Sequence, residues 1–135
     1  MDLTLTTLDT SHGAPDDRKI AEVLATLDGG RHILATLAES ELSYVQASGS
    51  VQKGFSLDYQ EGSLDRHYRS RAEDLPLDRI VRAFQRYSHG DETWREGFDW
   101  VHMPHVPQRT PWFSTWIGYL IVLGIVIALI WIWRG

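Results

Sequence analysis

The chain has 135 residues, no cysteine and a formal net charge of −5 at pH 7. The lack of cysteine excludes disulfides and a thiol nucleophile, and it fits a reducing compartment. Up to Gln108 the sequence holds eleven Lys and Arg against eighteen Asp and Glu, a balance that disfavours binding to nucleic acid.

The first predicted element is an amphipathic helix over residues 16–28, which follows a polar N-terminal lead. Its apolar side chains recur at helical spacing, at Ile20, Val23, Leu24 and Leu27. Acidic residues precede this stretch and Gly29 follows it, as expected for the start and end of a helix. The pattern therefore predicts a helix with one buried face.

Four strand-like stretches come next, at residues 31–38, 42–48, 52–60 and 63–71. The third alternates polar residues with the apolar series Phe55, Leu57 and Tyr59, which is typical of a strand with one buried and one wet face. Turns are expected at residues 48–50 and at residues 61–62, the latter as a two-residue hairpin connection. Together these stretches predict a small antiparallel β-meander.

Helical spacing returns after the meander, at Leu77, Ile80, Val81, Phe84 and Tyr87, and predicts a second amphipathic helix that ends at Gly90. Residues 91–103 fit both periods, and we expect a short helical turn followed by a short strand. The predicted class is α+β, with the meander packed against two amphipathic helices in a head domain of residues 1–103.

Residues 104–111 hold three prolines and are predicted to form a short, semi-rigid spacer. Residues 117–133 have no charged side chain, and eleven of these seventeen residues are Ile, Leu or Val. As a helix that begins at Trp112, the segment covers about 33 Å, which matches a hydrocarbon core of about 30 Å. The sequence therefore predicts a single transmembrane anchor over residues 112–135, with aromatic side chains at its membrane interfaces: Trp112, Phe113, Trp116, Trp131 and Trp133.

The N-terminus has no basic segment followed by an apolar one, so it does not resemble an export signal. We therefore expect a single-pass, tail-anchored protein whose head stays in the cytoplasm, with a bacterial inner membrane as the expected location. Its expected partners are membrane lipid, through the C-terminal helix, and a protein at the membrane.

The sequence contains no recognised catalytic motif. No serine lies in a nucleophile elbow, and the glycines lack the spacing of a phosphate loop. His102 and His105 have helical spacing, but Pro104 forces extended backbone between them and disfavours a shared metal. We expect no enzymatic activity, metal or cofactor. The alternative is a small membrane-anchored hydrolase or metal-dependent enzyme whose Asp, Glu and His groups are brought together by the fold.

Positive charge clusters on the fourth strand-like stretch and on the polar face of the second helix, and two tryptophans precede the spacer. The candidate partner-binding residues are Arg66, Arg69, Arg71, Arg79, Arg82, Arg86, Trp94 and Trp100. The structural alternative is a solvated face with salt bridges, beside tryptophans that cap the core.

These features predict a membrane-tethered, non-enzymatic protein-interaction module at the cytosolic face of a membrane. It would serve as an accessory subunit, a regulator or a protective binder such as a toxin-immunity protein. A lipid-headgroup sensor that uses the arginines is the other alternative.

Overall fold

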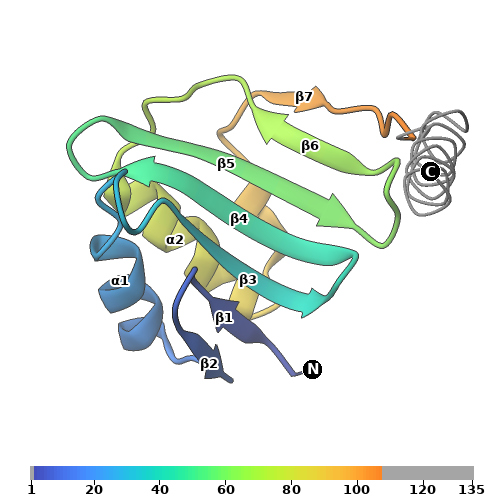
Figure 1. Cartoon of the computed structure of the whole chain (residues 1–135). Helices are drawn as coiled ribbons and strands as arrows, with labels where there is room; N and C mark the ends of the chain where they lie inside the picture. Colours follow the sequence, from blue (N-terminus) through green and yellow to red (C-terminus); the bar gives the residue numbers. More distant parts are fainter. Residues whose placement is uncertain (1, 108–135) are drawn as a thin grey trace, which may run out of the picture. The chain divides into compact units, whose positions relative to one another are not determined.

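The structure is a computed structural model that describes residues 2–107 (Figure 1). In these residues the strands are β1 Thr4–Thr6, β2 Ser11–Gly13, β3 Leu34–Ser40, β4 Ser43–Ser50, β5 Gly54–Glu61, β6 His67–Ser70 and β7 Trp100–His102. The helices are α1 Asp17–Ala25, α2 Leu77–Ser88 and the short 3-10 helix η1 Glu92–Arg95. The strands form one antiparallel sheet in the order β2-β1-β3-β4-β5-β6-β7, which confirms the α+β class.

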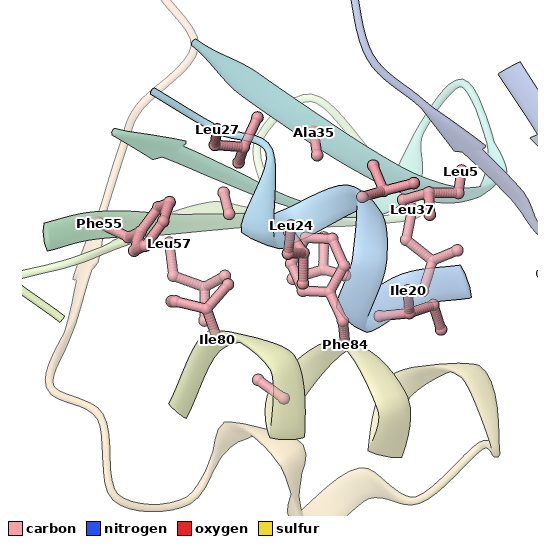
Figure 2. Close-up of a cluster of buried hydrophobic side chains, with 14 of the residues drawn as sticks. Leu5, Ile20, Leu24, Leu27, Ala35, Leu37, Phe55, Leu57, Ile80 and Phe84 are labelled. Atoms are coloured by element: carbon pink, nitrogen blue, oxygen red, sulfur yellow. The ribbon is translucent and has the colours of Figure 1, made fainter. Parts of the chain in front are cut away.

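Both α-helices lie on the same face of the sheet and bury their apolar sides against it (Figure 1). Figure 2 shows Leu24 and Phe84 from the two helices pointing toward Leu57 and Leu37 of the sheet. All four side chains are completely buried. Since burying one such side chain contributes about 1.5–3 kcal/mol, this single apolar layer holds the helices in place.

The sheet is larger than the four-stranded meander that the sequence predicts. The expected polar lead forms β1 and β2, and β1 pairs with β3 so that both strands extend the sheet on that side. Leu3 and Leu5 of this lead are buried in the core. Three-residue strands carry too few alternations to be recognised from their pattern, which explains the error.

Both predicted turns are displaced. Strand β4 runs through residues 48–50, and the turn lies at residues 51–53 instead. Strands β5 and β6 are joined by residues 62–66, where the Glu61 amide donates to the Arg66 carbonyl oxygen at 3.1 Å, so the two-residue hairpin is wrong. Gly49 lies within a strand, where the lack of a side chain lets two backbones approach closely. From the sequence alone, a glycine with this role looks the same as a glycine in a turn.

The expected helical turn and strand within residues 91–103 are confirmed as η1 and β7. The Asp91 carboxylate accepts a hydrogen bond from the Thr93 amide and caps η1. Strand β7 then pairs with β6, with Val101 opposite Arg69. This passage returns the chain from the end of α2 to the edge of the sheet.

The predicted anchor over residues 112–135 lies outside the described residues, as do its interface aromatics Trp112, Phe113, Trp116, Trp131 and Trp133. Within residues 2–107, no helix combines the length and apolar character needed to cross a bilayer. Contacts along the chain divide it into two units, residues 1–105 and 106–135.

Replacing Gly49 by alanine should destabilise the fold by more than about 2 kcal/mol, because a strained positive φ alone costs about 1–3 kcal/mol. Gly49 has φ +132°, and an added Cβ would overlap the Gly54 carbonyl oxygen. Urea unfolding of the full chain, followed by circular dichroism, measures the loss. Gly13→Ala is the matched control, since nothing lies within 4 Å of its Cβ position. Equal unfolding midpoints for the two variants would contradict the proposed close approach.

Candidate functional site

The structure divides the six predicted arginines between different surroundings. Arg79, Arg82 and Arg86 line one side of α2, and Arg71 lies just after β6. We call these four residues the arginine surface. Arg66 and Arg69 do not line it, because each is engaged elsewhere by a carboxylate.

The arginine surface contains two adjoining hollows that share Arg79 and Phe98. The first has a volume of about 60 Å³ and is lined by Arg79, Arg82, Ala83, Arg86, Trp94, Glu96 and Phe98. The second has a volume of about 320 Å³ and is lined by Ser70, Arg71, Ala72, Leu75, Arg79, Gly97, Phe98 and Asp99. Four guanidinium groups against two carboxylates leave the surface positively charged.

Within residues 2–107, no arginine of this surface forms an ion pair with a carboxylate. Arg79 is held by other means: its guanidinium carbon lies 4.4 Å from the centre of the Phe98 ring, and it donates to the Gly97 carbonyl oxygen. Arg82 and Arg86 are exposed. Their donors are therefore available to a binding partner.

Arg69 and Arg66 instead form ion pairs within the domain. Arg69 donates to both carboxylate oxygens of Asp58, at 2.8 and 3.2 Å, and this partner raises the pKa of the Arg69 guanidinium. Leu57 and Tyr59, on either side of Asp58, belong to the core, so Asp58 lies on the other face of the sheet. It is nevertheless only 5% exposed. Arg66 pairs with Glu61 at 2.8 Å. Both arginines thus have carboxylate partners within the domain.

The two predicted tryptophans pack into an aromatic cluster. Trp94 is 4% exposed and makes edge contacts with Tyr59 and Tyr87, with ring centres 5.0 and 5.5 Å apart. Trp100 is half-buried, and its Nε1 donates to the Arg95 carbonyl oxygen at 3.1 Å. Trp94 is therefore a wall of the first hollow and does not project as an exposed anchor.

A second, oppositely charged site lies next to Trp94 and is absent from the sequence prediction. It is a cavity of about 180 Å³, here called the acidic cavity, lined by Glu39, Ser43, Tyr59, Gln60, Glu61, Tyr87, Gly90, Glu92, Trp94 and Arg95. Burial, reinforced by Glu39, raises the pKa of the Tyr87 phenol, which stays protonated at neutral pH. The pairing of Glu61 with Arg95 spans 34 positions and leaves no local signal in the sequence.

The histidines of the sequence analysis do not converge. His102 Nε2 is hydrogen-bonded to the Asp65 carbonyl oxygen, and His105 is exposed. In the part of the chain that the structure describes, no three His, Asp or Glu side chains form a group suited to a metal ion.

Comparison with known proteins identifies no relative of this chain. No protein-family model matches this chain, and no curated protein or solved structure is significantly similar to it.

Replacing Asp58 by alanine should cost about 2 kcal/mol of stability, because two charge-assisted hydrogen bonds to Arg69 are lost. Arg66→Ala removes an exposed ion pair and should change stability by less than about 1 kcal/mol. Chemical unfolding of the full chain compares the two variants. A loss as small for Asp58→Ala as for Arg66→Ala would show that the Arg69 pair is not structural.

Proposed function

We propose that this chain is a membrane-tethered, non-enzymatic protein-interaction module. Its head docks an acidic segment of a partner protein on the arginine surface, at the cytosolic face of the membrane. The observation that carries the proposal is the set of four neighbouring arginines that have no carboxylate partner among the described residues. Other arginines of the same head, Arg66, Arg69 and Arg95, do have such partners.

Charge complementarity favours an acidic partner. The guanidinium fork matches a carboxylate in a two-point hydrogen-bonded geometry, and Arg82 and Arg86 are free to adopt it. The chain up to Gln108 is acidic in total, so the arginine surface is a local exception that orients an approaching acidic segment. An anionic leaflet is extended and also faces the acidic parts of the head, whereas a short acidic segment can contact the arginine surface alone, which favours a protein over lipid headgroups.

The membrane tether compensates for weak individual contacts. An exposed ion pair contributes only about 0.2–1 kcal/mol, so four arginines give modest affinity on their own. Holding both partners at one membrane turns docking into a nearly intramolecular event, with an effective concentration in the millimolar range for short linkers. A spacer of eight residues, with a reach of about 25 Å, suits this arrangement.

The arginine surface is tested with the full chain in nanodiscs of neutral lipid and a fluorescent oligoglutamate peptide as the probe. We expect Arg82→Glu/Arg86→Glu to weaken peptide binding at least tenfold, because attraction becomes repulsion. The affinity of the wild type for the peptide should fall as the salt concentration rises. The control Arg31→Glu/Lys53→Glu makes the same charge change at two exposed positions outside both hollows.

Two results would contradict docking of an acidic protein segment. An equal loss in both double variants would show an effect of net charge alone. Loss of peptide binding when anionic lipid is added to the nanodiscs would show that headgroups occupy the arginines, as a lipid sensor requires.

The tether is tested by cell fractionation. We expect the full chain to sediment with membranes and to resist carbonate extraction, because insertion of residues 117–133 is favourable by about 3–7 kcal/mol on the biological scale. A chain that ends at Pro107 should remain in the supernatant. Recovery of the full chain in a detergent-free supernatant would refute the anchor.

A further inference from the structure

The acidic cavity adjoins the first hollow of the arginine surface, and Trp94 lines both. Two sites of opposite charge thus adjoin one buried indole. The cavity volume of about 180 Å³ is large enough for a small organic group, since an engineered cavity of about 150 Å³ holds benzene. The chemistry of its walls indicates which group.

The walls of the acidic cavity already hold one guanidinium group. Arg95 Nη2 contacts the carboxylates of Glu61 and Glu92, the latter at 2.8 Å. The Arg95 guanidinium carbon also lies 5.2 Å from the ring centre of Tyr59 and 5.4 Å from that of Trp94. Carboxylates together with aromatic rings are the surroundings in which proteins bind organic cations.

Arg95 does not balance the charge around the cavity. Three carboxylates line the cavity: Glu61 is paired with Arg95 and Arg66 and Glu92 with Arg95, whereas Glu39 forms no ion pair within residues 2–107. The remaining negative charge therefore favours a second cation on the side of Glu39 and Tyr87.

A buried donor indicates that this cation also brings a hydrogen-bond acceptor. Arg95 lines the cavity, and its Nε is buried and has no acceptor among the described residues. A buried donor without an acceptor costs about 1–3 kcal/mol, and a backbone carbonyl next to a basic side chain would satisfy it.

We propose that the acidic cavity binds a lysine or arginine side chain of the partner protein whose acidic segment docks on the arginine surface. This inference rests on the proposed function and defines the partner further, as a segment with a basic residue close to its acidic ones. Two neighbouring sites of opposite charge would fix the direction of the bound segment, because the reversed orientation places like charges together.

The test uses the full chain in neutral nanodiscs and two acidic peptides that differ at one position, arginine or norleucine. We expect the wild type to bind the arginine peptide at least fivefold more tightly. Glu39→Gln should abolish this preference while binding of the norleucine peptide is retained. The matched control Glu41→Gln removes a charge two residues away, outside the cavity, and should keep the preference. A wild type without the preference, or an equal loss in both variants, overturns the proposal.

A second measurement separates this inference from the proposed function. The indole NMR signal of Trp94 is followed while ethylguanidinium chloride is added, with sodium chloride as the salt control. A shift in the wild type and in Glu41→Gln that is absent in Glu39→Gln supports the cation site. If neither peptide binds while this shift is seen, the proposed docking on the arginine surface is refuted and the cation site is not. Lack of any specific shift overturns the cation site. Binding of ethylguanidinium together with equal affinity for both peptides overturns the role in partner recognition.

Discussion

The position of α2 on the sheet determines where the charged side chains lie. Ile80, Ala83 and Phe84 are buried against the sheet, so the helical period turns Arg79, Arg82 and Arg86 to another side of the helix. Loss of the apolar contact would also release the arginines from their common orientation. The arginine surface is therefore a consequence of core packing, which fixes its geometry before any partner binds.

The aromatic cluster after α2 keeps the two charged sites apart. Trp94 packs edge-on against Tyr59 of β5 and Tyr87 of α2, so the short helix η1 is attached to both layers of the fold. Trp94 lines both the first hollow, with its arginines, and the acidic cavity, with its carboxylates. Among the described residues, no ion pair joins a carboxylate of the cavity to an arginine of the arginine surface, so these arginines and Glu39 stay available for binding.

The sequence predicts those features that depend on neighbouring residues. The periodicity of Ile80 and Phe84 identifies α2 and implies that Arg82 and Arg86 share a polar face, as the structure confirms. The pairing of Glu61 with Arg95 is not predictable in this way, because it depends on how β5 and η1 meet in three dimensions. The N-terminal strands also escape prediction, since Leu5 acquires its burial only by pairing with β3.

The opposite charges of the two sites have a consequence for specificity. A purely acidic ligand gains from Arg82 and Arg86 but meets the unbalanced Glu39 at the cavity, while a purely basic ligand has the reverse problem. Only a segment with both signs in the correct order avoids repulsion, so discrimination arises from unfavourable charge contacts as much as from favourable ones. Weak, exposed ion pairs would suffice for such discrimination under the proposed membrane tether, because the tether would supply local concentration and the charges would supply orientation.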